Sequence, residues 1–348
     1  MRRLILALIG LVVVAAALGA GAVSWLDRRT GLPYRGYAGE ERLVVIEPGD
    51  SVAAIGGRLV SAGVVLDART FRWAVWRRGV SRRLQAGEFR FTRAVSIRDV
   101  VDTLVRGDVA RWPLTFPEGL TVADMGDVFA RAGFGSAAAF GDAARAVDLI
   151  RDLDPHATDL EGYLFPDTYS LPRGTSAPRL VALMVAGFRD AFGHTLRDEA
   201  ARLGLSVRQA VTIASLIEKE TAKPEERSLV SAVYHNRLRI GMRLQCDPTI
   251  IYVLVRAGRY DGNLHKADLD LDSPYNTYRY AGLPPGPIAA PGRASLDAAV
   301  RPASVDYLYF VSRNDGSHVF ASTLQEHNAN VRRYQVEYFR ERRRRAGK

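Results

Sequence analysis

The sequence has few of the residues that build metal or disulfide centres. Its 348 residues include one cysteine, Cys246, which excludes an intramolecular disulfide and a thiolate zinc cage. The six histidines show no HExxH spacing, so we expect no metal site and no cofactor. With 47% hydrophobic and 25% charged residues, the chain does not have the composition of a disordered, collagen-like or multi-span membrane protein.

Positive charge is scarce in the middle of the chain and concentrated at its two ends. Of the net +10, residues 340–348 contribute +5 and residues 1–29 contribute +3, which leaves +2 for the rest. A nucleic-acid-binding protein places its positive field on the folded body. We therefore expect no nucleic-acid partner, and we interpret residues 340–348 as a disordered, solubilising or anionic-lipid-attracted tail.

One long apolar segment is present near the amino terminus. No charged residue occurs from Leu4 to Trp25, and a helix of that length measures about 33 Å, close to the thickness of a hydrocarbon core. We interpret it as a retained anchor. The alternative is a cleaved signal peptide, because Ala17–Ala20 resembles a cleavage site. Both interpretations place the following residues outside the cytoplasmic membrane, as expected for a single-pass protein of the bacterial inner membrane.

A strand–turn–helix pattern occurs twice, seventy residues apart. In each copy a glycine suited to positive φ precedes a hydroxyl that caps a helix: Gly49 and Ser51 in the first copy, Gly119 and Thr121 in the second. The first copy, around residues 45–55, is similar to the opening of LysM modules, small folds that bind N-acetylglucosamine glycans. Glycan binding and a purely architectural role both remain open for it.

We predict an α+β protein with an N-terminal membrane helix, a small LysM-like βααβ module and a mixed α+β catalytic domain. Its expected parts are a cytoplasmic N-terminus (1–3), a transmembrane anchor (4–26), a linker (27–40), the LysM-like module (41–110), the catalytic domain (111–339) and a basic tail (340–348).

The most informative element is the helix predicted from Ser206 to Thr221. Ser206 and Gln209 form a capping box that fixes its start. A step of about 100° per residue places Glu218 on the apolar stripe. A carboxyl on an inward face loses hydration, which raises its pKa and suits a general acid. The alternative is that Glu218 only marks the frayed helix end. Glu220 rotates away from the stripe and is expected to be solvated.

Loops rich in proline and glycine follow this helix and carry Gln, Asn and Tyr side chains, at residues 245–249 and 275–288. Rings that stack on sugar faces and amides that bond hydroxyls suit a carbohydrate groove, although well-packed turns use the same residues.

Five motifs, in order along the chain, resemble those of the MltG/YceG-like endolytic murein transglycosylases. They are Glu161–Tyr169, Ala214–Thr221, Gln245–Thr249, Tyr275–Tyr278 with the Gly282–Ile288 run, and Glu326–Asn328. The resemblance covers the chain from the anchor to about Tyr338. Two positions depart from the family pattern: Cys246 stands where serine is usual, and Ala290 stands where asparagine is common.

The resemblance implies a lyase that cuts the β-1,4 bond between N-acetylmuramic acid and N-acetylglucosamine in nascent peptidoglycan. Cleavage without water would leave a 1,6-anhydromuramyl end and terminate strand elongation. Glu218 would be catalytic, and peptidoglycan synthases (penicillin-binding proteins) would be candidate partners. Motif membership makes substrate-binding candidates of Glu161, Gln245, Asp247, Asn276, Tyr278 and Glu326. Glu326 also forms a capping box with Thr323, which is its stronger interpretation. The competing hypothesis is a membrane-tethered, non-enzymatic peptidoglycan-binding or scaffold protein.

Overall fold

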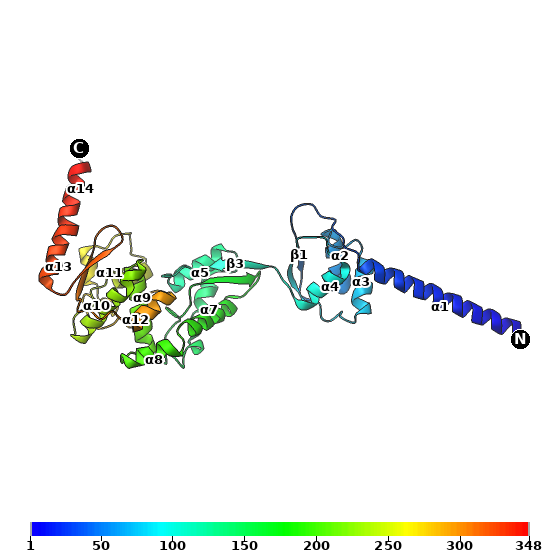
Figure 1. The fold of residues 1–348 in the computed structure, drawn as a ribbon, viewed down its shortest axis with the longest axis horizontal. Helices are drawn as coiled ribbons and strands as arrows, with labels where there is room; N and C mark the ends of the chain where they lie inside the picture. The colour runs from blue at the N-terminus through cyan, green and yellow to red at the C-terminus, as the bar shows by residue number, and fades with distance from the viewer. Residues whose placement is uncertain (1, 347–348) are drawn as a thin grey trace. The chain divides into compact units, whose positions relative to one another are not determined.

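A computed structural model describes residues 2–346 (Figure 1). Met1, which belongs to the predicted segment 1–3, and residues 347–348 of the predicted tail lie outside the described residues. The fold is mixed α+β with an N-terminal apolar helix, as predicted.

The chain divides into two compact units. Unit 1 comprises the residues up to Pro113 together with Ser170–Arg173, and unit 2 comprises Leu114–Tyr169 together with the residues from Gly174 onward. The chain passes between the units within the paired strands β3 (Arg111–Thr115) and β4 (Thr168–Pro172).

Unit 1 is built on a two-stranded antiparallel sheet. Its elements are α1 (Arg2–Thr30), β1 (Arg42–Ile46), α2 (Val52–Ser61), α3 (Ala68–Arg77), β2 (Gly87–Phe91) and α4 (Ile97–Arg106). Val44 of β1 lies opposite Phe89 of β2, and both side chains are buried. They pack in one core with Leu59, Phe71 and Leu104 from the helices. The strand–helix–helix–strand order is the one predicted, while the likeness to LysM modules remains a prediction.

The apolar helix α1 extends further than the sequence predicted. Ile5–Thr30 is long and apolar enough to cross a membrane, with a mean hydropathy of 2.6 in its most apolar window. This helix is consistent with a membrane anchor. The predicted linker from residue 27 is partly wrong, because Asp27 to Thr30 form the last helical turn.

Both copies of the predicted strand–turn–helix pattern are present. Gly49 and Gly119 have φ angles of 87° and 78°. Ser51 caps α2 by accepting the Ala54 N–H, and Thr121 caps α5 (Val122–Arg131) in a full capping box. The caps satisfy N–H groups that the first turn of a helix leaves free, so these short motifs fold as their sequence predicts.

Unit 2 is largely helical. After α5 come α6 (Ala137–Ala143), α7 (Ala177–Ala191), α8 (His194–Arg202), α9 (Val207–Glu220), α10 (Arg227–Arg239), α11 (Asp247–Arg256), α12 (Arg293–Val300), the hairpin strands β5 (Tyr309–Ser312) and β6 (His318–Ala321), α13 (Leu324–Val331) and α14 (Tyr338–Ala346). α9 packs against α12, α10, α11 and α8. β5 and β6 pair as an antiparallel hairpin, with Asn314 at positive φ in its turn.

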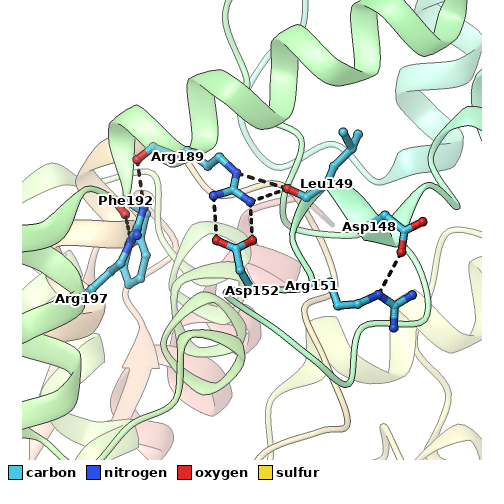
Figure 2. Close-up of polar contacts among 7 residues, drawn as sticks. All are labelled: Asp148, Leu149, Arg151, Asp152, Arg189, Phe192 and Arg197. Atoms are coloured by element: carbon cyan, nitrogen blue, oxygen red, sulfur yellow. Dashed lines mark hydrogen bonds and ion pairs between the residues drawn. The ribbon is translucent and has the colours of Figure 1, made fainter.

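Ion pairs and backbone acceptors hold α7 in place within unit 2 (Figure 2). The Arg189 guanidinium donates to both carboxylate oxygens of Asp152 and to the Leu149 carbonyl. Arg197, in α8, donates to the Phe192 carbonyl at 2.8 Å. Arg189 thus joins α7 to the turn at residues 149–152, and the buried Phe188 ring of α7 meets the Tyr163 ring edge to face.

Two segments of unit 2 consist of turns. Pro224–Glu226 forms a 3-10 turn directly before α10. Residues 160–167 are mostly turns, and β4 begins only at Thr168. The tail predicted to be disordered is helical through Ala346 in the described part of the chain.

Candidate active site

α9 carries the carboxylate that the sequence indicated. Its start is fixed by the predicted capping box between Ser206 and Gln209. Residues 210–217 are all buried, since neighbouring helices enclose this part of α9. The sequence predicted that only one apolar stripe of this helix is buried, but its polar residues Thr212 and Ser215 are buried as well. Glu218 is the first residue after this buried run.

Two hydrogen bonds, one helical turn apart, hold a loop along α9. The Ile288 N–H donates to Ser215 Oγ at 3.1 Å, and the Gly292 N–H donates to Glu218 Oε2 at 2.9 Å. Glu218 is half-buried, so its carboxylate lies at the edge of the packed helix and against the backbone of this loop. It does not merely mark a frayed helix end.

A second carboxylate, Glu118, lies against the same glycine. A Cβ atom on Gly292 would be 1.8 Å from Glu118 Oε1, so this carboxyl occupies the space that any side chain at position 292 would need. The turn that carries Glu118 is fixed by two backbone bonds: Gly119 N–H to the Ala290 carbonyl and Ala290 N–H to the Leu120 carbonyl, both 2.8 Å. Two carboxylates from distant parts of the sequence thus meet at Gly292.

Burial and the neighbouring charge of Glu218 favour the protonated form of the Glu118 carboxyl. Burial of its carboxyl end and the neighbouring charge of Glu218 raise the pKa of Glu118, although the residue as a whole is exposed. The positive charge of Arg227 opposes this rise. The Arg227 Nε is buried and has no hydrogen-bond partner within residues 2–346.

Glu118 was not among the residues that the motifs indicated, although the sequence contains a signal for it. In the first copy of the repeat the residue before the positive-φ glycine is Pro48, whereas in the second copy it is Glu118. The two copies otherwise match, so the exchange of the rigid Pro48 for a carboxylate indicates that Glu118 does more than shape the turn.

The prediction that Glu220 is solvated is wrong. Its Oε2 lies 3.3 Å from the Tyr234 hydroxyl and 3.6 Å from the Cys246 thiol. Burial, and then the charge of Asp247, raise the pKa of Glu220. Glu220 lies on a different side of α9 from the predicted apolar stripe. That side is covered by α10 and by the start of α11, so Glu220 is not solvated.

The predicted loop residues next to Glu220 lie together. The Tyr278 hydroxyl donates to Asp247 Oδ1 at 2.5 Å, and both residues flank the buried Cys246. Gln245 is exposed and held at positive φ, and its N–H donates to the Thr277 carbonyl. Gln245, Asp247 and Tyr278 therefore form one polar cluster at the N-terminus of α11.

Glu161 lines a cavity of about 510 Å³ near the N-terminus of α5. Its Oε1 accepts the Val122 N–H at 3.1 Å, and its Oε2 accepts the Tyr252 hydroxyl at 3.4 Å. Arg256 and Asp159 line the same cavity. Glu161 is only 7% exposed, and this burial raises its pKa to about 8.

Replacing Glu161 with glutamine is expected to stabilise the protein above neutral pH. The pKa of Glu161 rises from an ordinary 4.5 to about 8 on folding, so its favourable contribution is complete below pH 4.5 and is lost as pH rises through 8. The isosteric amide carries no charge, and the difference in unfolding free energy reaches on the order of 4 kcal/mol above pH 8. Thermal unfolding of both proteins between pH 4.5 and 9 checks this, because a pH-independent difference contradicts it.

Two predicted candidates have their polar groups committed to the fold. The Asn276 amide is buried, donates to the Leu269 and Leu271 carbonyls, and accepts the Tyr278 N–H. The Glu326 carboxylate accepts the Thr323 N–H in the capping box that begins α13. Both side chains therefore support loops and helix ends, and their predicted contact with substrate remains a prediction.

Among the described residues, no group of three or more His, Cys, Asp or Glu side chains is arranged to hold a metal ion. The chemistry available at this site is that of carboxylic acids, a guanidinium and backbone N–H groups.

Comparison with known proteins places these residues in a family context. Residues 44–333 match the profile of the YceG-like family. The endolytic murein transglycosylase of Bacillus subtilis strain 168 is 32% identical over 305 residues, which is 83% of each chain. That of Streptococcus pneumoniae D39 is 30% identical over 323 residues, or 83% of this chain and 57% of the relative.

A solved structure extends the comparison to three dimensions. The 2.6 Å crystal structure of a putative yceG-like protein from Listeria monocytogenes is 31% identical and superposes with a TM-score of 0.57. The match covers 83% of this chain and 98% of that one. With the profile match extending from β1 to beyond α13, the chain belongs to the YceG-like family.

Proposed function

We propose that this chain is an endolytic murein transglycosylase, a lyase that cuts glycan strands of peptidoglycan between N-acetylmuramic acid and N-acetylglucosamine. Curated relatives carry that name, and the B. subtilis relative matches over most of both chains. The observation that carries the proposal for the site is the half-buried Glu218 carboxylate, hydrogen-bonded to Gly292 beside a second carboxylate. A non-enzymatic scaffold is not favoured, because these relatives are named for an enzymatic activity.

Glu218 acts first as general acid and then as general base. The protonated carboxyl donates to the oxygen of the β-1,4 bond as an oxocarbenium-like centre develops at C1 of the muramyl sugar. The resulting carboxylate takes the proton from the C6 hydroxyl of the same sugar, whose oxygen attacks C1 and closes a 1,6-anhydro ring. An intramolecular nucleophile has a high effective concentration, so the reaction needs no activated water.

Glu118 acts as a positioning residue beside Glu218. Its carboxyl fills the space next to Gly292, whose N–H binds Glu218 Oε2, and burial together with the charge of Glu218 raises the pKa of Glu118. Arg227 limits the effect by supplying a compensating positive charge. The chemistry at the sugar remains with Glu218.

Analysis of the cleavage products tests the proposed reaction. Purified glycan strands are incubated with the full chain, and the new ends are identified by mass spectrometry. We expect 1,6-anhydromuramyl ends with no uptake of water. Reducing muramyl ends that carry the mass of one water would show a hydrolase, and intact strands would show that the chain is not a glycan-cleaving enzyme.

Replacing Gly292 with alanine is expected to lower the cleavage rate with little effect on stability. The backbone angles at Gly292, φ −76° and ψ 173°, suit alanine, but the new Cβ displaces the Glu118 carboxyl. Misplacement of a group that supports catalysis costs on the order of 10- to 100-fold. Gly193→Ala, at an N-cap glycine with similar backbone angles (φ −69°, ψ −175°) where the added Cβ would meet only the Asp190 carbonyl oxygen at 3.4 Å, is the matched control. Equal rates for both variants would contradict the proposed placement.

The same proposal assigns a location and partners. α1 anchors the chain in the cytoplasmic membrane with both units on the extracytoplasmic side, where nascent peptidoglycan is made. The βααβ module of unit 1 is LysM-like and binds glycan, and peptidoglycan synthases are partners. Accessibility of single introduced cysteines to a membrane-impermeant thiol reagent in intact cells tests this orientation.

A further inference from the structure

The end of α1 is joined to the folded part of unit 1 by specific contacts. Residues 5–25 of α1 are exposed, whereas Thr30 is buried. Arg98 of α4 donates to Thr30 Oγ1 at 3.0 Å and to the Asp27 carbonyl at 2.7 Å. These bonds satisfy acceptors in the last helical turn, so the helix is fixed to the unit directly after its apolar run.

α3 lies beside this junction, and its exposed side combines arginines with a tryptophan. Its inward face buries Phe71, Ala74 and Val75 in the core. Its outward side carries the exposed Arg69, Arg72, Trp76 and Arg77. Trp76 is 67% exposed, which is a large apolar area for a side chain on a soluble surface.

Two hollows adjoin the end of α1, and arginines line both. One, of about 430 Å³, is lined by Arg77, Arg78, Arg98 and Thr30 and by the carboxylates of Asp27 and Asp102, among others. The other, of about 810 Å³, is lined by Trp25, Arg29, Leu66 and Arg69 and by Asp67, whose carboxylate is bonded to Thr70, among others. Arg78 is paired with Asp102, whereas Arg69 and Arg77 have no carboxylate partner among residues 2–346.

We propose that this surface, formed by the end of α1 and the outward face of α3, binds the headgroups of anionic phospholipids. The inference rests on the proposal that α1 is a membrane anchor. A membrane-spanning helix brings the residues at its end to the headgroup layer, where tryptophan and arginine side chains are favoured. The headgroup phosphates complement the unpaired Arg69 and Arg77, and residues 41–113 carry thirteen arginines against eight acidic residues.

The position of the surface favours lipid over glycan as its ligand. Tryptophan also stacks on sugar rings, but N-acetylglucosamine, the sugar that LysM modules bind, carries no charge to match the arginines. The surface also begins where the apolar helix ends, so a bilayer that holds α1 lies next to it. Binding there would hold unit 1 at the membrane surface.

A fluorescent label at position 76 tests the proposal in the full chain. Trp76→Cys, in a Cys246→Ser background, is labelled with an environment-sensitive dye and reconstituted in vesicles. We expect a blue shift in phosphatidylcholine vesicles containing phosphatidylglycerol, relative to phosphatidylcholine alone. Raising salt from about 0.01 M to about 1 M shortens the Debye length from about 30 Å to about 3 Å and should abolish the difference.

Charge-reversal variants supply the matched comparison. Arg69→Glu with Arg77→Glu is expected to lose the blue shift. Arg82→Glu with Arg83→Glu changes the same number of charges on exposed residues that line neither hollow and should retain it. Equal emission in both vesicle types, or a shift produced by soluble glycan strands instead, overturns the proposal. A chain that fails to float with vesicles overturns the anchor premise and this inference, but leaves the glycan-cleavage proposal intact.

Discussion

Replacing Glu218 with glutamine is expected to lower the rate of glycan-strand cleavage by about 10²- to 10⁴-fold. The amide has the size of the carboxyl and can still accept the Gly292 N–H, but it cannot donate a proton to the leaving sugar oxygen or later remove one from the C6 hydroxyl. The measurement is the rate at which anhydromuramyl ends form from purified strands, together with thermal unfolding of the variant.

Glu225→Gln is the matched control for this experiment. Glu225 lies in the 3-10 turn that follows α9 and is exposed, so the same chemical change there should leave the rate unchanged. A Glu218→Gln protein that unfolds at the wild-type temperature yet cleaves strands at the wild-type rate would remove Glu218 from the mechanism.

Replacing Glu118 with glutamine is expected to lower kcat/KM for strand cleavage by about 10-fold and to change its pH profile. Burial and the charge of Glu218 raise the pKa of Glu118, so the wild-type profile contains the titration of this carboxyl. An amide at position 118 does not titrate, so the variant is expected to lack that limb of the profile. The measurement is kcat/KM for the formation of anhydromuramyl ends across the pH range, made on both proteins.

The variant Glu118→Asp distinguishes the effect of the negative charge at this position from the effect of side-chain length. Glu118→Asp keeps the negative charge on a shorter side chain and is expected to restore part of the wild-type pH profile. A Glu118→Gln enzyme whose pH profile has the wild-type shape would contradict the role of an ionisable carboxyl at this position and leave Glu118 as a turn residue. Because Glu218→Gln is measured separately, this result would not affect the assignment of the general acid.

Local patterns in the sequence predicted the parts of the fold whose causes are local. A capping residue and the N–H groups that it satisfies lie within three or four positions of one another, which is why the starts of α2, α5, α9 and α13 were predictable. The same holds for the β5–β6 turn at Asn314. Helical rotation also indicated Glu218, although it described only one buried stripe on a helix that is enclosed on several sides.

The end of α1 and the start of α10 were less predictable, because the residue pattern there does not mark where the helix ends or begins. The polar residues from Asp27 to Thr30 suggested a linker, but contacts from Arg98 keep them helical. Pro224 suits the first turn of a helix, and the chain uses it in a 3-10 turn before α10 begins.

The sequence alone was enough to indicate the long apolar helix, the capped helices and the position of Glu218 on α9, because each depends on residues close together in the chain. Only the tertiary structure placed Glu118 beside Glu218, buried Glu161 at the end of α5 and covered Glu220 with Tyr234 and Cys246. Burial and charge proximity depend on which distant segments pack together, and no local period or motif records that packing.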